Sequence, residues 1–348
     1  MARKATPGLE DEATAATGRT VTSYDVALHA GVSQSAVSRC FTHGASVSKS
    51  TRARIMKAVD DLGYQPNAIA RTLITKRSNL VAVIVANLGF NPEFTSILSS
   101  LFAARGLNVL LFTLDHESDS DQVVDQLWQY RVDGVISAAQ LSERHVAMLG
   151  KRNLPVVFLN RSYDTIAVNS VCCDQAEGER WLVDRLVASG HRRFGIVSGP
   201  TEAFVSRQRV ASATSRLLQA GITAPTVIEG DFTYDGGRSA MRALASGNGV
   251  PDAVICANDM MAIGCIDEAR HALGLQVPAA LSIVGFDGSA QGRWAAYDLT
   301  TVRQPTRTMV EAAIDMLVAR IDDGTIGCEK RMLSGELVVG SSARFGAT

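Results

Sequence analysis

The sequence predicts a small all-α head followed by an α/β body of two lobes, each built on a doubly wound parallel sheet. Three short helical segments, each preceded by a serine or threonine that can cap it, lie between about residues 20 and 65. From Val81 onward, strand-sized apolar runs alternate with helical stretches, which is typical of parallel sheets covered on both faces. Roughly 270 residues of this pattern exceed what one sheet usually holds, so two lobes are expected.

The composition indicates a globular protein of more than one domain. The chain has 348 residues, of which 46% are hydrophobic, and no apolar run approaches the roughly 18 residues of a membrane span. The start, MARKATPGLEDEATAATG, has no apolar stretch after its basic residues, so we expect a disordered tail over residues 1–19 and no secretory signal. A cytoplasmic, nucleoid-associated protein is the expectation.

Cysteine and histidine spacing favours no metal site. The six cysteines form no C-x-x-C pair, and the six histidines show no H-E-x-x-H spacing. We therefore expect no cofactor and no metal, and we expect the cysteines to be small buried residues in a reducing compartment. Cys172 and Cys173 are neighbours on a predicted strand, where their side chains would point to opposite faces.

The charge of the chain is unevenly distributed. The formal net charge is −1, but nine basic and three acidic residues between Arg19 and Arg77 give that segment about +6. A basic head on an acidic body is expected when one end of a protein meets phosphate, although a solvated helix surface can also carry such charge.

The head pattern is helix, turn and capped helix. Helices are predicted at Tyr24–His29, at Gln34 to about Phe41, and from Ser48 or Ser50 to Leu62. Gly31 supplies the backbone freedom that the first corner requires, and Ser33 is placed to cap the second helix. This is the helix-turn-helix arrangement, although small three-helix bundles also serve other purposes.

The second helix carries side chains suited to base edges. Ala36 and Val37 are placed to pack inward, whereas Gln34, Ser35 and Arg39 can face outward. Glutamine pairs well with adenine, arginine with guanine, and serine with either. These three residues are therefore the expected base contacts.

A short segment follows the head. Pro66 suits the first turn of a helix, and Asn67–Ile74 is long enough for only two turns, which are marginal alone in water. Such a segment can be coil in the free protein and helix on a partner.

The body has polar residues where its predicted strands end. We expect strands at Val81–Ala86, Asn108–Leu114, Asp133–Ser137, Val156–Asn160, Arg193–Ser198, Val227–Asp231, Ala253–Ala257, Ser282–Phe286 and Glu336–Val339, with helices such as Phe94–Arg105, Gln122–Gln129 and Asp259–Leu273 between them. Ligands bind beyond the carboxyl ends of such strands. The signatures of nucleotide-binding loops and hydrolase nucleophile elbows do not occur.

The head and body together resemble the lactose-repressor/galactose-repressor (LacI/GalR) family. The matching stretches are T-x-Y-D-V-A (22–27), A-G-V-S (30–33), V-S-R (37–39), V-S-x-x-T-R (47–52), L-G-Y-x-P-N-x-x-A-R-x-L (62–73), R-V-D-G-V-I (131–136), G-H-R-R-F-G-I-V-S-G-P (190–200), A-N-D-M-M-A-I-G (257–264), V-G-F-D (284–287) and L-T-T-V-R-Q-P (299–305). Through this family the body also resembles the type I periplasmic sugar-binding proteins.

The resemblance implies how the head binds DNA. Two hinge helices would lie side by side in the minor groove, with Leu73 as a wedge in the central base step and Arg71 near phosphate. An ordinary linker leucine packed on the body is the alternative for Leu73. The DNA-binding residues expected in all are Thr22, Tyr24, Ser33, Gln34, Ser35, Ser38, Arg39, Ser48, Thr51, Asn67, Ala70, Arg71 and Leu73.

The resemblance also implies an effector site between the lobes. Arg209 would clamp the ligand, Asp287 would accept hydrogen bonds from its hydroxyl groups, and Phe232 would stack on a sugar ring. Asn258 can serve as a helix cap or as a ligand contact. The expected effector-binding residues are Asn160, Arg161, Arg207, Arg209, Phe232, Asn258 and Asp287.

The implied domain order is a tail (1–19), a helix-turn-helix domain (20–65), a hinge (66–78) and a two-lobed body (79–348). Its N-lobe would comprise about 79–174 and 304–332, and its C-lobe about 175–303 and 333–345. We expect a repressor that binds a palindromic operator as a homodimer and responds to a sugar-like or sugar-acid effector, either inducer or co-repressor. A cytoplasmic solute-binding protein and an α/β enzyme are the alternatives; the chain offers no nucleophile–base pair, so no enzyme is expected.

Overall fold

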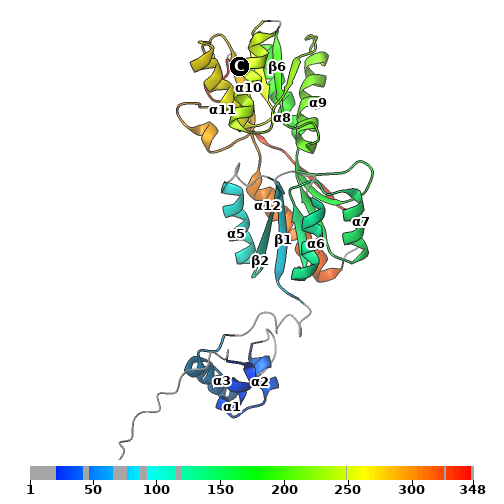
Figure 1. The fold of residues 1–348 in the computed structure, drawn as a ribbon, viewed down its shortest axis with the longest axis vertical. Helices are drawn as coiled ribbons and strands as arrows, with labels where there is room; N and C mark the ends of the chain where they lie inside the picture. The colour runs from blue at the N-terminus through cyan, green and yellow to red at the C-terminus, as the bar shows by residue number, and fades with distance from the viewer. Residues whose placement is uncertain are drawn as a thin grey trace, which may run out of the picture. The chain divides into compact units, whose positions relative to one another are not determined.

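The computed structural model describes residues 21–41, 47–65, 77–86, 92–114, 120–247, 249–324 and 327–345, and the chain divides into two compact units between Ser78 and Asn79 (Figure 1). The expected tail and residues 66–76 of the expected hinge lie outside the described residues. We call the first unit the head and the second the body.

The head contains the three expected helices. They are α1 (Ser23–Ala30), α2 (Gln34–Cys40) and α3 (Lys49–Leu62). The expected bounds of all three differ from these by no more than one or two residues at each end.

Local side chains determine where each head helix begins and ends. The backbone N–H and the hydroxyl of Thr22 both donate to Asp25 Oδ2, at 2.8 and 2.7 Å, which closes the start of α1. Ser33 Oγ accepts from the Ala36 amide, and Ser48 Oγ accepts from the Thr51 amide. At the end of α1, Gly31 has φ of +60°, the left-handed conformation that glycine adopts without strain.

The head has its own small core. Val26, Val37 and Ile55 come from the three different helices, and each is 1% exposed or less. Ala58 on α3 is also buried, one turn from Ile55. The helical spacing of these apolar residues therefore packs the three helices together.

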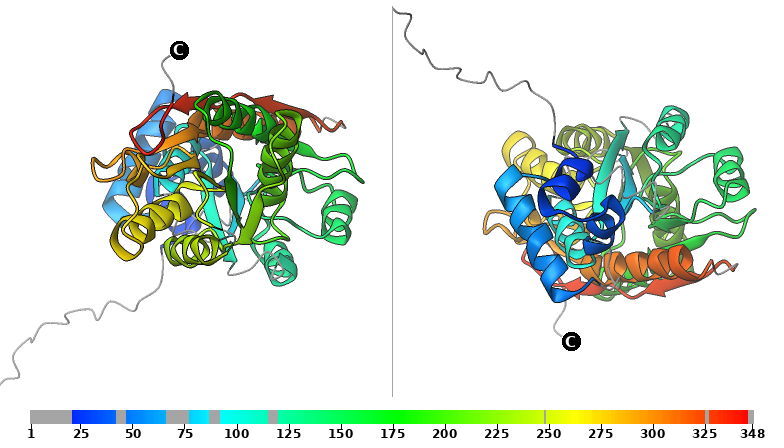
Figure 2. Two further views of the ribbon diagram at one scale, coloured as in Figure 1. Left: turned by 90° about the horizontal axis from the view of Figure 1, so that it is seen from above. Right: turned by 90° about the horizontal axis from the view of Figure 1, so that it is seen from below.

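The body contains two six-stranded sheets, each with helices on both faces. The first sheet has the order β11-β5-β4-β3-β1-β2 and is entirely parallel; the second has the order β12-β10-β9-β8-β6-β7 and is parallel except for β12. Figure 2 shows, from above, helices on either side of the second sheet. This is the expected fold class.

The elements of the first lobe are β1 (Leu80–Ala86), α5 (Pro92–Ala104), β2 (Asn108–Leu114), α6 (Ser120–Tyr130), β3 (Gly134–Ser137), α7 (Glu143–Lys151), β4 (Val156–Leu159), β5 (Asn169–Cys173), α12 (Thr306–Asp323) and β11 (Lys330–Leu333). The elements of the second lobe are α8 (Gln175–Ala188), β6 (Phe194–Ser198), α9 (Phe204–Gln219), β7 (Thr226–Glu229), α10 (Tyr234–Ser246), β8 (Ala253–Cys256), α11 (Asp259–Asp267), β9 (Ser282–Asp287), β10 (Thr300–Arg303) and β12 (Glu336–Val338).

Strand β1 shows why the sheets need helices on both faces. Val81, Val83 and Val85 pack into one core with α5 and α12, whereas Ala82 and Ile84 pack into another with α6. Because successive side chains of a strand point to opposite faces, an unbroken apolar run buries both.

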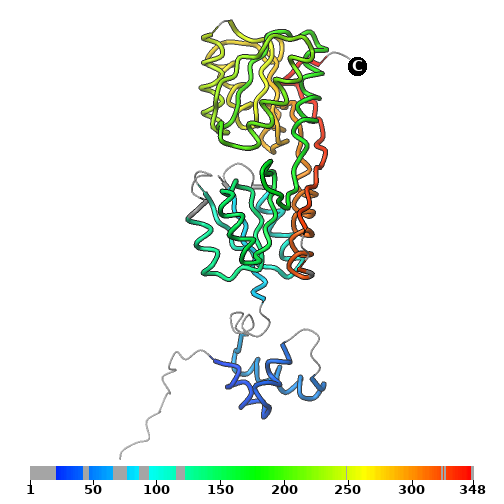
Figure 3. Tube along the Cα trace, turned by 90° about the vertical axis from the view of Figure 1, so that its right-hand side faces the viewer, coloured from blue at the N-terminus to red at the C-terminus, as the bar shows by residue number. Residues whose placement is uncertain are grey.

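The chain passes between the two sheets three times: after β5, after β10 and after β11. Figure 3 shows the C-terminal segment, in red, running along one side of both lobes. The third passage places β11 in the first sheet and the nearby β12 in the second. Both lobes therefore contain chain from distant parts of the sequence.

The structure corrects some of the expected elements. Strands β10 and β11 were not expected, and the predicted helix Asp259–Leu273 continues beyond Asp267 as a π-helical turn, Glu268–Ala272. Apolar periodicity does not distinguish an α-helical turn from a π turn. Five cysteines are buried as expected, but Cys328 is exposed, so that expectation is wrong for Cys328.

Among the described residues, no helix has both the length and the apolar character needed to cross a membrane.

We predict that Gly178→Ala destabilises the body. A Cβ atom at Gly178 would lie 2.7 Å from Phe286 Cε2 in the core, and overpacking of this kind costs about 1–3 kcal/mol. Denaturant unfolding measures the change in the free energy of unfolding.

The matched control is Gly150→Ala on α7, where a Cβ atom would meet nothing within 4 Å. Alanine is the better helix former by about 1 kcal/mol, so this variant should not be destabilised. Equal effects of the two substitutions would contradict the packing argument.

Candidate functional sites

The second head helix presents a polar outer face. Ser35 and Arg39 are exposed one turn apart on α2, and Arg39 Nε donates to the Ser35 carbonyl oxygen at 3.3 Å. Gln34 is half-buried, and its Nε2 donates to Ser23 Oγ at 3.4 Å. Val37 faces the core as expected, whereas Ala36 is half-buried. The three expected base-contacting residues thus lie in the first turn of α2 and one turn beyond it.

Several expected DNA-binding residues lie at helix N-termini. Thr22 precedes α1, Ser33 precedes α2, and Ser48 precedes α3, where its hydroxyl also donates to Thr51 Oγ1 at 2.8 Å. Helix N-termini present backbone N–H groups that suit phosphate. Tyr24 on α1 is 71% exposed, a large value for an aromatic side chain.

The structure describes only one of the five remaining DNA-binding residues expected from the sequence. Ser38 is half-buried on α2. Asn67, Ala70, Arg71 and Leu73 lie outside the described residues.

Arg209 is the centre of a buried polar group in the body. This α9 side chain is only 3% exposed, and its Nε donates to Gln175 Oε1 at 2.7 Å. Its Nη1 donates to the Ala257 carbonyl oxygen at 2.5 Å and lies 3.0 Å from Asp287 Oδ1. The guanidinium also stacks 3.8 Å above the Phe286 ring. A buried cation thus has a carboxylate partner and several oriented acceptors.

Gln304 joins the two lobes. Its Nε2 donates to Asp287 Oδ1 at 2.7 Å, and its Oε1 accepts from Asn160 Nδ2 at 2.5 Å. Asn160 follows β4 of the first sheet, Asp287 ends β9 of the second, and Gln304 lies on the second passage between them. We call Asn160, Gln175, Arg209, Asp287 and Gln304 the interlobe cluster.

Three expected effector residues have unusual backbone conformations. Asn160 has φ of +53°, Phe232 of +66° and Asp287 of +131°. Asparagine and aspartate tolerate positive φ better than other L-residues, so Phe232 is the clearest outlier of the three, and such outliers cluster at functional sites. All three residues end or closely follow a strand, where ligands of parallel sheets bind.

Phe232 and Asn258 are linked to each other. Asn258 Oδ1 accepts from the Met261 amide at 2.9 Å, and its Nδ2 donates to the Phe232 carbonyl oxygen at 3.0 Å. Asn258 is therefore the cap of α11, one of the two roles left open for it. The Phe232 ring packs tightly over the Gly199 backbone, where a Cβ atom would overlap it.

Arg161 and Arg207 lie apart from the Arg209 guanidinium. Arg161 Nη1 donates to the Asn160 carbonyl oxygen at 3.0 Å. Arg207 is exposed, and its Nη1 donates to the carbonyl oxygens of Thr201 and Glu202. Residues two apart on a helix do not share a face, so Arg207 is directed away from Arg209.

Two buried acids lie behind the cluster. Asp259 Oδ1 accepts from the Thr301 hydroxyl and Oδ2 from the Ser289 amide, both at 2.6 Å. Burial, together with the charge of Asp287, raises the pKa of Asp259 to about 6. Burial likewise raises the pKa of Glu179 on α8 to about 8, although Arg209 lowers it.

Three residues of this region, Gln175, Glu179 and Gln304, are not among the residues expected from the sequence. Gln304 stands inside the quoted L-T-T-V-R-Q-P stretch, so a polar residue directly after a strand was an available signal. Gln175 and Glu179 occur one turn apart on a helix and carry no motif.

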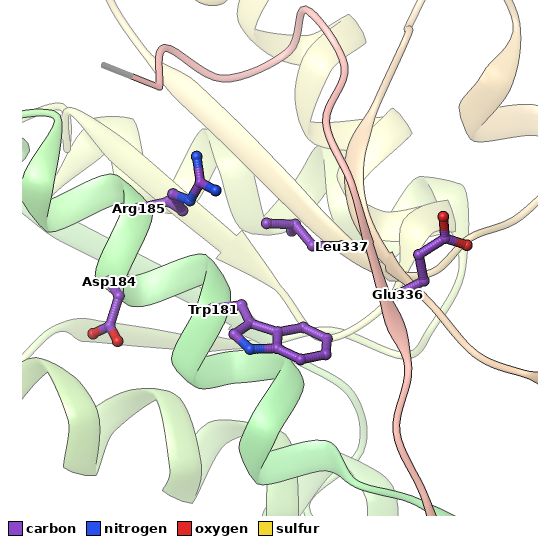
Figure 4. Close-up of a pocket in the computed structure, with 5 residues that line it drawn as sticks. All are labelled: Trp181, Asp184, Arg185, Glu336 and Leu337. Carbon is purple, nitrogen blue, oxygen red and sulfur yellow. The ribbon is translucent and has the colours of Figure 1, made fainter. Parts of the chain in front are cut away.

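A shallow groove of about 450 Å³ lies elsewhere on the second lobe (Figure 4). It is lined by Trp181, Asp184 and Arg185 of α8 and by Glu336 and Leu337 of β12. None of the expected effector residues lines it.

The chain is similar to known proteins over nearly its whole length. Residues 22–67 match the family described as bacterial regulatory proteins, lacI family, and residues 183–343 match a periplasmic binding protein-like domain. The chain is 31% identical to catabolite control protein A of Priestia megaterium over 313 residues, which are 88% of this chain and 94% of that protein.

Solved structures agree with this similarity. The lac repressor dimer bound to operator and the anti-inducer ONPF matches with a TM-score of 0.85 and 29% identity, over 93% of this chain and 99% of that one. A complex of the transcriptional regulator CelR with cellobiose matches with a TM-score of 0.71 and 30% identity, over 92% and 99% of the two chains.

We predict that Gln304→Leu weakens the connection between the lobes. The substitution removes one donor and one acceptor and leaves Asn160 and Asp287 without these partners, which should lower the free energy of unfolding by about 1–3 kcal/mol. Denaturant unfolding gives the size of the loss, and amide hydrogen exchange at Arg161 and Gly288 shows whether it is local.

The matched control is Gln219→Leu on α9, an exposed glutamine whose change should stay within about 0.5 kcal/mol. If Gln304→Leu leaves the free energy of unfolding and the amide hydrogen exchange unaltered, the hydrogen bonds of Gln304 do not stabilise the connection between the lobes.

Proposed function

Because the chain belongs to the lacI family of bacterial regulatory proteins, which are DNA-binding transcriptional repressors with a periplasmic binding protein-like ligand domain, we propose that it represses transcription from a palindromic operator as a homodimer. We further propose that a small hydroxylated effector bound between its lobes changes its affinity for DNA. The observation that carries the proposal is the interlobe cluster, in which a buried arginine, a carboxylate and three side-chain amides meet where the chain passes from one sheet to the other.

The head is proposed to read DNA with α2. Gln34, Ser35 and Arg39 would contact base edges in the major groove, since they lie near the N-terminus of a capped helix. The residues proposed for phosphate and flanking contacts are Thr22, Tyr24, Ser33, Ser38, Ser48 and Thr51. The segment with Asn67, Ala70 and Arg71 would enter the minor groove, with Leu73 as its wedge.

Dimerisation is proposed to use the outer edge of the first sheet. Strand β2 is an edge strand, and its Val109 and Leu111 are 36% and 41% exposed on the same face. Exposed apolar residues on an unpaired edge favour association with another chain. A symmetric dimer would present two heads to two half-sites, which is the reason for proposing a palindrome.

The effector is proposed to contact Asn160, Arg209, Phe232 and Asp287 directly. Their charged and amide groups, together with one aromatic ring, suit a sugar or a sugar acid, and the similar CelR structure contains cellobiose. Arg161 would lie at the margin. Arg207 donates to the Thr201 carbonyl oxygen, and Asn258 is bonded to backbone groups of Phe232 and Met261, so both would contact the effector only after rearranging.

Regulation is proposed to follow from a change in lobe arrangement. The lobes would comprise about residues 79–174 with 304–332, and 175–303 with 333–345. An effector can shift the protein from a DNA-competent state only by binding the other state more tightly, and DNA must then weaken effector binding by the same factor.

We predict that Gln34→Ala and Arg39→Ala each weaken binding to the protein's own palindromic operator by roughly 5- to 150-fold, because each removes a base contact. A gel-shift titration with the operator and with unrelated DNA measures specific and non-specific affinity, and raising the salt concentration should weaken both.

The control is Arg144→Ala on α7 of the body, an exposed arginine outside the head, which should leave both affinities unchanged. Equal losses of specific and non-specific affinity in the α2 variants would refute base reading by this helix.

We predict that Arg209→Ala abolishes the response to effector. A thermal-shift screen of neutral sugars, sugar acids and sugar phosphates identifies a compound that raises the melting temperature of the unmodified protein, since ligand binding to the native state stabilises it. The variant should show no shift with that compound, yet still bind operator without it.

Arg216→Ala, on the same helix α9 but paired with Asp184 and not among the proposed effector contacts, is the matched control and should respond normally. A response that survives in Arg209→Ala would exclude the proposed site.

A further inference from the structure

Glu179 is a buried acid without a bonding partner. It lies on α8 one turn beyond Gln175, and its side chain is 0% exposed. Neither of its carboxyl oxygens has a hydrogen-bond partner among the described residues. Buried polar groups are nearly always hydrogen-bonded, so a buried carboxyl group without a hydrogen-bond partner is unusual and calls for an explanation.

The position of Glu179 brings it under the influence of Arg209. Helices α8 and α9 pack against each other (Figure 1), and Gly178, the neighbour of Glu179, packs against the Phe286 ring on which Arg209 stacks. Arg209 is the charged group that lowers the pKa of Glu179, and burial opposes it more strongly. In this state Glu179 is therefore largely protonated at neutral pH.

Among the described residues, three further titratable groups interact electrostatically with Glu179, Arg209 or Asp287. Cys256, at the end of β8, has its pKa raised by burial and, in smaller part, by the charge of Glu179. Asp259, at the start of α11, has its pKa raised by burial and Asp287. Cys173, at the end of β5, has its pKa raised by burial to about 11, while Arg209 lowers it. Among the groups named here, Arg209 is the one cation facing Glu179.

The two carboxyl groups that act on Arg209 differ in access. Asp287 is bonded to the guanidinium and its side chain is 32% exposed, whereas Glu179 is unbonded and fully buried. A ligand that donates hydrogen bonds would reach Asp287 and not Glu179. Competition for Asp287 would leave a buried cation with less compensating charge, which is costly unless another anion replaces it.

We propose that Glu179 is a second counter-ion for Arg209, which ionises when an effector draws Asp287 away, so that effector binding releases a proton to the solvent. The carboxyl group of Glu179 loses its proton, and the resulting carboxylate balances the guanidinium. This inference rests on the proposed function, since it takes Arg209 and Asp287 as effector contacts.

The inference also names the effector class. A neutral compound that donates hydroxyl hydrogen bonds to Asp287 leaves Arg209 in need of a second anion. An anionic effector would supply that charge itself and keep Glu179 protonated. The proposed ionisation of Glu179 therefore requires a neutral, hydroxylated effector.

Asp287→Asn in the unliganded full chain tests the exchange of counter-ions without DNA or effector. The amide keeps the size of the side chain and removes the charge, as a competing ligand would in part. Glu179→Gln is then made in both backgrounds, and the melting temperature of the body is measured from about pH 5 to pH 9. Asp287→Ser replaces Asp287→Asn should that variant not fold.

With Asp287 present, Glu179→Gln should stabilise the folded chain at high pH. The pKa of Glu179 in the folded chain, about 8, lies above its ordinary value of 4.5, so folding loses stability as pH rises between those values. The variant has no such loss, so its melting temperature should be close to that of the parent near pH 5 and exceed it by roughly 10 °C at pH 8.

With Asp287 replaced, the sign of the effect should invert. Glu179 is then ionised and paired with Arg209, so Glu179→Gln should lower the melting temperature at pH 8. Glu177→Gln, two residues away on α8 and half-buried, is the control and should leave both pH profiles unchanged.

The same sign in both backgrounds, or identical pH profiles of parent and Glu179→Gln, would overturn the inference. Because this experiment measures only the unliganded body, its failure would leave the DNA and effector experiments above intact, and their failure would not alter its result.

Discussion

The ion pair between Arg209 and Asp287 determines how the body is organised around its centre. A guanidinium that is 3% exposed must be balanced by charge and by oriented acceptors. These come from the start of α8, the end of β8 and the end of β9. Three elements of the second lobe are therefore held in register by one side chain, and Gln304 extends the same network to Asn160 of the first lobe.

The polar contacts between the two lobes stabilise the body and can also be replaced by a polar ligand. Beside an apolar cluster that includes residues of both lobes, polar groups at strand ends connect the lobes, and a polar ligand can substitute for these polar contacts at moderate cost. Asn160, Phe232 and Asp287 all have positive φ, and the strain of this conformation is greatest at the aromatic Phe232. Polar contacts of this kind suit the change in lobe arrangement proposed above, since each is replaceable by water or by a polar ligand.

The head follows a different principle. Its core consists of a few small and branched side chains, and capping hydrogen bonds supply much of its local order. The polar side chains of α2 are consequently left for an external partner. Under the proposed function, sequence recognition would require a second copy of the chain, because one short helix contacts few base pairs.

Much of this structure was available from local patterns. Three short helical segments with serine or threonine caps predicted the head, Ser33 and Gly31 predicted its first corner, and the apolar run from Val81 predicted a strand of a sheet covered on both faces. The family resemblance implied the roles of Arg209 and Asp287. Caps, turns and apolar periods depend on neighbours a few residues away, so one sequence suffices to identify them.

Tertiary structure alone decided which polar residues meet. Gln304 and Asn160 are 144 residues apart, Arg209 and Gln175 are 34 apart, and no local pattern predicts either contact. Glu179 is the clearest case, because its sequence context suggests a solvated helix residue and the packing of α8 buries it completely. The chemical type of a side chain is set by the sequence, but its charge state and partner depend on solvent exclusion, which exists only after distant segments have packed together.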